Sequence, residues 1–359
     1  MIISILAVLF TFGLVIFLHE FGHFLVCKLS GIRVEAFSFG FGPELYGRTK
    51  GDTRYSVRAV PLGGYVKPAG ESIDEVSGSP DEYFSKPWYT RMGVVFAGPF
   101  MNYLLALVIF SGVVLVVGEP TYSTAPVIGD MSLGFPAETA GLKAGDKVLK
   151  VDGKAVSTWA EMAEKIYPKV EKEVSLTYLR GGAEAVVKLK TRKAPDGTGR
   201  GVIGIAPAME YKRVPVLKGV AMGASQCWFW SALTVKTLKS NFEKREKPDL
   251  AGPIGIVNIV SKAAHTGPVE LILLIGIISV AVGFFNLLPI PLLDGGWLLL
   301  FLFEGVFRRK ITGNVMKYVN GAGIALLLSI FLFATYNDIA RIVTSHAAKK
   351  AAAAQSQGK

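Results

Sequence analysis

Residues 1–27 read MIISILAVLF TFGLVIFLHE FGHFLVC, and the architecture of the chain follows from this stretch. Residues 1–19 contain no Asp, Glu, Lys or Arg. A helix of about 20 apolar residues crosses the hydrocarbon core of a bilayer, so the stretch predicts a membrane span. No basic residue precedes its apolar part and no small-residue cleavage site follows it. We therefore expect the span to be retained and not removed as a signal peptide.

The composition indicates the same class of protein. Of the 359 residues, 51% are hydrophobic and 19% are charged, whereas a soluble domain carries about 25% charged residues. We therefore expect several membrane spans and one water-facing domain. The two cysteines, Cys27 and Cys227, exclude a disulfide framework and a cysteine-based zinc site. The net charge of +11 indicates cytoplasmic loops and contact with lipid headgroups, with no nucleic-acid partner.

Three further stretches lack acidic and basic residues over a length that can span a bilayer. They lie between Arg91 and Glu119, between Glu270 and Asp294, and between Lys317 and Asp338. Residues 219–235 are also uncharged, but their tryptophans and basic flank are typical of an amphipathic helix on the membrane surface. That flank consists of Lys236, Lys239, Lys244, Arg245 and Lys247. The predicted fold is a multi-pass α-helical membrane protein with four transmembrane helices.

The basic residues of the short connecting loops predict the orientation of the spans. Lys and Arg are concentrated between the first and second spans and again between the third and fourth. Both loops are therefore expected in the cytoplasm, which puts both termini and residues 119–268 outside. The basic tail opposes this orientation mildly, through Arg341, Lys349, Lys350 and Lys359.

The first span carries the motif His19-Glu20-Phe21-Gly22-His23. Positions i and i+4 of a helix share one face, so both imidazoles can reach one zinc ion. Glu20 stands beside the first ligand, where a carboxylate can act as general base on water. Two histidines and a glutamate are costly inside a membrane and are functional candidates by default. The alternative is polar side chains that only pack against other helices.

A catalytic zinc ion usually takes three protein ligands and keeps one open position. His265 and His346 are most simply solvated, and Cys27, one turn beyond His23, is a weaker candidate. Asp294 is the better third ligand, since both it and His23 are expected towards the cytoplasmic ends of spans that run in the same direction.

Asp294 belongs to the stretch NLLPIPLLDGG, residues 286–296. Pro289 and Pro291 do not fit a regular helix, so this stretch should be unwound at membrane depth. Such backbone is tolerated only where it is buried in protein or lines a cavity, and a carboxylate there suits a metal. The alternative is a helix-terminating Asp-Gly-Gly turn at the membrane edge.

Together these motifs resemble the site-2 protease family of intramembrane zinc metalloproteases, in particular the bacterial branch that cleaves membrane-anchored anti-sigma factors (the regulator-of-sigma-E protease type). Four further stretches are similar to the family: GFGP at 40–43, PLGGYVK at 61–67, AGPFMN at 97–102 and AGPIGI at 251–256. The first two resemble its membrane-reentrant β-hairpin region. The resemblance extends over nearly the whole chain.

The resemblance implies His19, His23 and Asp294 as zinc ligands and Glu20 as catalytic base. It implies that Asn286, Pro289 and Pro291 bind the substrate, with Asn286 holding it or polarising its scissile carbonyl. It also implies transmembrane substrates, such as anti-sigma factors or signal-peptide remnants, and a multi-pass location in the bacterial inner membrane. The chain departs from the family pattern in having Trp297 where many members have His after Asp-Gly-Gly, and in having room for one PDZ domain where the best-known relatives have two.

Residues 125–208 resemble a bacterial PDZ domain, through GFPAETAGLKAGD at 134–146, a strand and turn at 147–153, and GVIGI at 201–205. Such a domain binds a peptide as an added strand. Three roles are open to this domain: it binds a newly exposed carboxyl terminus of the substrate, it excludes substrates with bulky ectodomains by size, or it is a simple spacer. We favour the size filter. The expected domains are a first membrane-core segment (1–118, with the β region 33–67), the PDZ domain (119–210), an interfacial helix and linker (211–250), a second membrane-core segment (251–341) and a flexible tail (342–359).

The function expected from these residues is hydrolysis of peptide bonds inside the membrane. A membrane zinc transporter or zinc-delivery protein is the alternative, because His and Asp also line ion paths; it leaves Glu20 and the PDZ-like region unexplained. A catalytically silent PDZ scaffold leaves the intact HExxH motif unexplained.

Overall fold

The computed structural model describes residues 2–244, 252–310 and 312–357. Its internal contacts divide the chain into two units. The first consists of Met1–Val113 and Val216–Lys359, and the second of Val114–Pro215. The domain expected at 119–210 falls inside the second unit. Of the segments expected to form the membrane core, 251–341 and residues 1–113 of the first segment fall in the first unit, and residues 114–118 fall in the second.

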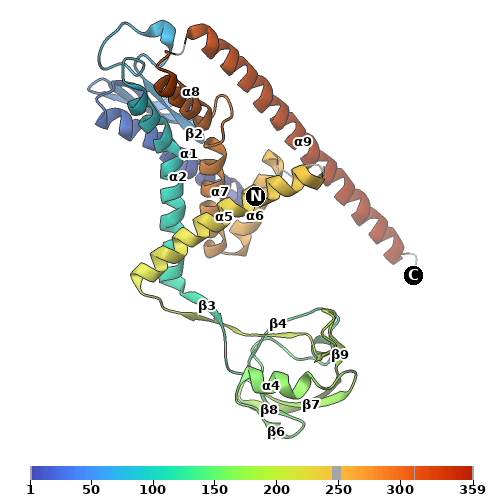
Figure 1. The fold of residues 1–359 in the computed structure, drawn as a ribbon. Coiled ribbons are helices and arrows are strands. Elements are labelled where there is room, and N and C mark those ends of the chain that lie inside the picture. Colours follow the sequence, from blue (N-terminus) through green and yellow to red (C-terminus); the bar gives the residue numbers. More distant parts are fainter. Residues whose placement is uncertain (1, 245–251, 311, 358–359) are drawn as a thin grey trace. The chain divides into compact units, whose positions relative to one another are not determined.

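Within the described residues, four helices are long and apolar enough to cross a membrane: α1 (Ile2–Leu29), α2 (Trp88–Val117), α7 (Pro268–Asn286) and the Gly313–Arg341 stretch of α9 (Gly313–Gln357) (Figure 1). The four predicted spans are thereby confirmed as helices of spanning length. Helix α9 continues to Gln357, so most of the region expected as a flexible tail is helical; residues 358–359 lie outside the described ranges.

Three more helices accompany these four: α5 (Val216–Lys244), α6 (Pro253–Thr266) and α8 (Asp294–Phe307). Helix α5 covers the expected surface helix and is not one of the candidate spans. It lies along α2, since Tyr103 hydrogen-bonds Ser231 at 2.9 Å and Gly223 sits against Ser111. The side chain of α5 residue Cys227 is buried in the same packing. Of its expected basic flank, Arg245 and Lys247 lie outside the described residues.

Helix α8 was not anticipated from the sequence, because the Asp-Gly-Gly with which it begins is also typical of a turn that ends a helix. Its 14 residues are apolar apart from Asp294 and Glu304. Glu304 forms an ion pair of 2.5 Å with Arg91 of α2; the Arg91 side chain is buried and the Glu304 side chain is partly buried. Phe301 of α8 packs with Tyr83 and Cys27 in one apolar cluster. These contacts hold α8, and with it Asp294, against the first two spans.

A β-sheet follows the first span. Strands β1 (Val34–Lys50) and β2 (Thr53–Pro68) are long, antiparallel and bent. Residues 36–39 pair with 54–57 on one side and with 64–67 on the other. The segment 64–67 is thereby an outer strand of this sheet, with one edge unpaired in the described pairings. The predicted β region is present. A short 3-10 helix, η1 (Ile73–Glu75), follows.

The second unit is an α+β fold. Its antiparallel sheet has the order β6-β5-β7-β8, covered by helix α4 (Trp159–Ile166), with the core around Val148, Leu176 and Met162. The strands of this unit are β3 (Glu119–Tyr122), β4 (Ile128–Met131), β5 (Lys147–Val151), β6 (Lys154–Ala155), β7 (Glu173–Arg180), β8 (Ala183–Lys190), β9 (Arg192–Lys193), β10 (Gly201–Val202), β11 (Ile205–Pro207) and β12 (Met209–Lys212), with the short helix α3 (Pro136–Thr139).

Candidate metal centre

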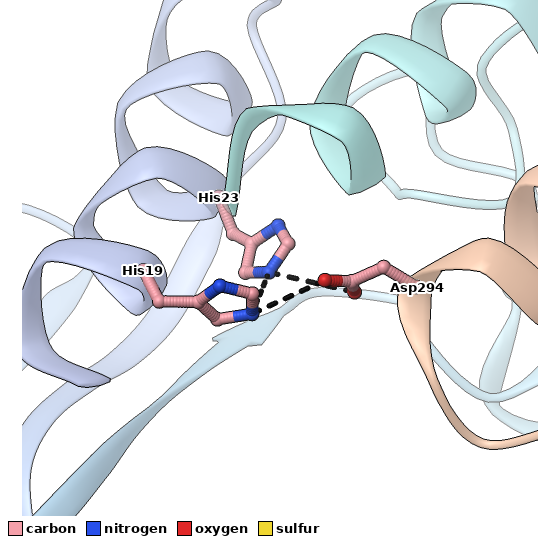
Figure 2. A group of neighbouring side chains, drawn as sticks. All are labelled: His19, His23 and Asp294. Atoms are coloured by element: carbon pink, nitrogen blue, oxygen red, sulfur yellow. Dashed lines mark hydrogen bonds and ion pairs between the residues drawn. The ribbon is translucent and has the colours of Figure 1, made fainter. Parts of the chain in front are cut away.

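Two histidines of α1 and one aspartate of α8 converge in the first unit, which we call the membrane unit. Nε2 of His19 lies 3.1 Å from Oδ2 of Asp294, and Nε2 of His23 lies 3.6 Å from Oδ1. The two Nε2 atoms are 3.2 Å apart. Figure 2 shows the two imidazoles of α1 and the Asp294 carboxylate of α8 pointing at one another. Among the described residues, they form the one group of His, Cys, Asp and Glu side chains whose ligand atoms all lie within 4.8 Å of each other.

The local sequence explains why each ligand reaches this point. His19 and His23 are one turn apart on α1, so their rings stand on one face. The chain between α7 and α8, residues 287–293, is not helical, which fits the two prolines it contains. Added Cβ atoms at Gly295 and Gly296 would lie 2.1 Å from Leu288 O and 2.4 Å from Ile290 O. The Gly-Gly pair therefore lets the first turn of α8 fold back onto this segment and bring Asp294 to the histidines.

Helix α2 supports both imidazoles from the other side. Nδ1 of His23 lies 2.8 Å from the carbonyl oxygen of Val94, and Nδ1 of His19 lies 3.2 Å from the side-chain amide of Asn102. A Cβ atom at Gly98 would stand 2.3 Å from Nε2 of His23 and 2.8 Å from Cε1 of His19. The resemblance of AGPFMN, residues 97–102, to the family assigns no role to its individual residues. Asn102 is a polar side chain in an apolar span, and this feature of the sequence could have identified it as a functional residue.

These residues fit a zinc ion. Two imidazoles and one carboxylate are a ligand set that zinc accepts in catalytic sites. Oδ2 of Asp294 is buried without a hydrogen-bond donor, as is Oδ1 of Asn102. The carbonyl of Val94 accepts from Nδ1 of His23, which leaves its Nε2 lone pair facing Asp294. Nε2 of His23 and Oδ2 of Asp294 are thus two acceptor atoms that face one point beside Nε2 of His19, and a cation there removes the electrostatic cost of burying them together.

A cavity of about 330 Å³ adjoins this group. Glu20 lines it beside the two histidines, and Val66, Glu71, Asn286 and Trp297 line it from other elements. Glu20 and Val66 line this cavity together. Of the predicted substrate-side residues, Asn286 reaches the cavity, whereas Pro289 and Pro291 are not among its described lining residues.

The weaker ligand candidates do not reach the group. Cys27 is fully buried in the apolar cluster with Val34 and Tyr83. His265 is exposed on α6 and hydrogen-bonds Ser261 of its own helix. His346 lies outside the residues whose side chains the structure describes.

Comparison with known proteins places this geometry in a family. A profile of Peptidase family M50 matches residues 7–330. A Clostridium acetobutylicum protein is 33% identical over 94% of this chain and 97% of its own length. A Fusobacterium nucleatum protein is 35% identical over 91% of this chain and 96% of its own. A Mesorhizobium japonicum protein is 33% identical over 92% and 97%, respectively. The names of all three provisionally describe them as zinc metalloproteases.

Among solved structures, a PDZ domain from Listeria monocytogenes is 26% identical to this chain, covers 24% of it and 90% of its own length, and has a TM-score of 0.22. The fold of the second unit therefore rests on its own strands and helices. The family match extends over both membrane segments and includes the three converging side chains. The chain belongs to Peptidase family M50, the site-2 proteases, and is a multi-pass membrane member of this family of zinc metalloproteases.

Proposed function

We propose that this protein is an intramembrane zinc endopeptidase that performs regulated intramembrane proteolysis, hydrolysing peptide bonds within the transmembrane segments of single-span proteins. One observation carries the proposal: His19, His23 and Asp294 converge at a cavity lined by Glu20, and the first two belong to a helix with the length and composition of a membrane span. Ionisable side chains at that depth are costly unless they serve a site.

In this proposal His19, His23 and Asp294 hold zinc and Glu20 is the general base. When bound, zinc supplies Lewis-acid polarisation of the scissile carbonyl and lowers the pKa of water. Glu20 takes the proton from the attacking water and delivers it to the leaving amine. Asn286, which lines the same cavity, donates to or accepts from the substrate backbone.

A peptide bond in a helix is shielded by its own hydrogen bonds, so the substrate must be extended before cleavage. We propose that it adds to the outer strand 64–67, whose far edge is unpaired in the described pairings. Val66 and Pro68 of this region line the cavity beside Glu20. Strand addition replaces the lost helical hydrogen bonds, which is required where no water is present. This role places the β1–β2 sheet at membrane depth, as a reentrant element.

The proposed location is the cytoplasmic membrane of a bacterium, with the second unit on the extracytoplasmic side, because the basic loops are retained in the cytoplasm. The proposed substrates are single-span proteins such as anti-sigma factors or signal-peptide remnants. The second unit is proposed to be a PDZ domain that excludes substrates with bulky ectodomains. Its apolar cavity of about 480 Å³, lined by Trp159, Met162 and Ile203, supports the alternative role of peptide binding.

The test is proteolysis by purified protein in vesicles, with a panel of single-span substrates and the variants Glu20→Gln and His23→Gln. Glu20→Gln should abolish cleavage and retain zinc, whereas His23→Gln should lose both. The matched control is His265→Gln, which removes an exposed imidazole outside the group and should change neither. Cleavage retained by Glu20→Gln in a clean preparation would refute the proposal.

The same vesicles separate proteolysis from zinc transport. A zinc-sensitive dye inside them should show no flux that depends on His23. Zinc entry that persists in Glu20→Gln, with no cleavage of any substrate by wild-type protein, would instead establish a transporter.

A further inference from the structure

Strands β3 and β12 form a two-stranded ribbon at the base of the second unit. Tyr122 lies opposite Met209, and Tyr211 lies opposite Pro120. Since side chains alternate along a strand, these four residues share one face. Glu119, Thr121, Glu210 and Lys212 make up the other face. The ribbon is therefore apolar and aromatic on one side and polar on the other.

The two faces differ in how they are satisfied. On the polar face, Thr121 donates a hydrogen bond of 3.2 Å to the carbonyl of Glu210, and Ser123, just beyond β3, donates to the Glu210 carboxylate. On the apolar face, Tyr122, Met209 and Tyr211 are 64%, 55% and 57% exposed. A ribbon of two strands is marginal by itself in water, and an apolar face of this kind normally has a cover.

The ribbon is fixed to the end of a membrane span. Gly118 alone separates α2 from β3. It has a positive φ, and a Cβ atom added there would lie 2.9 Å from the carbonyl oxygen of Lys212, so β12 packs closely against this junction. Helix α2 is apolar to its last residue, and Val116 is 86% exposed. An exposed valine at the end of a membrane helix belongs in lipid. A span of this length and composition is expected to leave the hydrocarbon layer near this junction, where the ribbon begins.

We propose that the β3–β12 ribbon lies in the membrane–water interface, with Pro120, Tyr122, Met209 and Tyr211 turned into the bilayer. The occupant of the apolar face is lipid because the ribbon begins only two residues after Val117, where the apolar α2 ends. Tyrosine suits this position, since its ring is apolar and its hydroxyl reaches the headgroups. The ribbon anchors the base of the second unit to the bilayer where the chain leaves and re-enters the membrane unit. This function is additional to proteolysis.

The test uses the full-length protein in lipid nanodiscs, with one nitroxide label at a time on an introduced cysteine. Tyr122→Cys, Met209→Cys and Tyr211→Cys report the apolar face, and Thr121→Cys and Glu210→Cys are matched controls on the polar face. Protein with only the buried Cys27 and Cys227 gives the background. Labels at 122, 209 and 211 should be relaxed more by oxygen, which partitions into lipid, than by a water-soluble nickel chelate. Labels at 121 and 210 should show the reverse.

Equal access of the chelate to both faces would overturn the proposal, since the ribbon then stands in water. Shielding of the apolar face from both reagents would also overturn it, since protein then covers that face. Three labelled positions report independently, so one poorly tolerated substitution leaves the pattern readable. The measurement needs no proteolysis, so its outcome is independent of the proposed enzymatic function.

Discussion

The amide nitrogen Nδ2 of Asn102 lies 3.2 Å from Nδ1 of His19, although the two residues belong to different spans. Its Oδ1 atom is buried without a partner, and a half-turn of the amide brings this oxygen to Nδ1. An imidazole that binds metal through Nε2 carries its proton on Nδ1 and needs an acceptor there. Asn102 is therefore suited to fix the ring and the tautomer of His19.

Asn102→Leu should lower zinc affinity about 10–100-fold, the usual effect of losing such a partner. Asn102→Asp should lose less, because a carboxylate still accepts from Nδ1. Zinc affinity is measured by competition with a chelator, so the result does not depend on proteolysis. Val108→Ala, an exposed position on the same helix, is the control. Unchanged affinity in Asn102→Leu would show that His19 needs no such partner.

Gly98→Ala should abolish zinc binding and proteolysis. Its Cβ would stand 2.3 Å from Nε2 of His23, closer than non-bonded atoms approach, so the imidazole must leave its position. Gly93→Ala and Gly112→Ala are matched controls in the same helix, because a Cβ at either position meets nothing within 4 Å. Zinc content after purification distinguishes the three variants. Full zinc occupancy in Gly98→Ala would contradict the structure of this site.

Glu304→Gln should destabilise the membrane unit by about 3–5 kcal/mol, because it leaves Arg91 buried without its charge partner. Asp294 begins the helix that carries Glu304, so zinc affinity should fall as well. Arg91→Leu and Glu304→Leu each leave one charge without its partner, whereas Arg91→Leu/Glu304→Leu leaves neither charge, and this double variant should be more stable than either of these two single variants. Thermal unfolding in detergent measures the cycle. Additive effects of the two single changes would mean that the pair is not coupled.

The stability of the second unit should depend on Asp146. Arg180 donates two hydrogen bonds of 2.7 Å to its buried carboxylate, and this interaction lowers the pKa of Asp146 below its usual value. Because the pKa of Asp146 is lower in the folded state than in the unfolded state, its ionised carboxylate stabilises the fold. This stabilisation is fully present above the unfolded-state pKa of about 3.9 and is lost as the pH falls through the folded-state pKa.

Asp146→Asn should therefore destabilise this unit by about 1–3 kcal/mol near neutral pH, and its difference from wild type should shrink below pH of about 4. Proteolytic cleavage within residues 114–215 of the full-length protein, followed against pH, measures this difference. A constant difference from pH 7 to pH 3 would rule out Asp146 as the source. Glu164→Gln, which changes an exposed carboxylate of α4, provides the control.

Several features could be predicted from the sequence because each depends on local composition. The four spans follow from long uncharged stretches, and the pairing of His19 with His23 follows from the helical repeat. Asp294 could be singled out because two prolines and two glycines surround it. Helix α8 was missed because its apolar residues follow Asp-Gly-Gly directly, and this pattern also ends a helix.

The rest depends on contacts between residues far apart in the chain. The sequence by itself determined which segments are apolar enough for a membrane and which side chains suit zinc, because burial and ligand chemistry are properties of single residues and short repeats. Only the tertiary structure decided that Asn102 and Val94 hold the two imidazoles, that Gly98 makes room for them, and that Arg91 holds α8 in place. The physical reason is that close packing selects one arrangement of several helices at once, and no stretch of the chain contains that information alone.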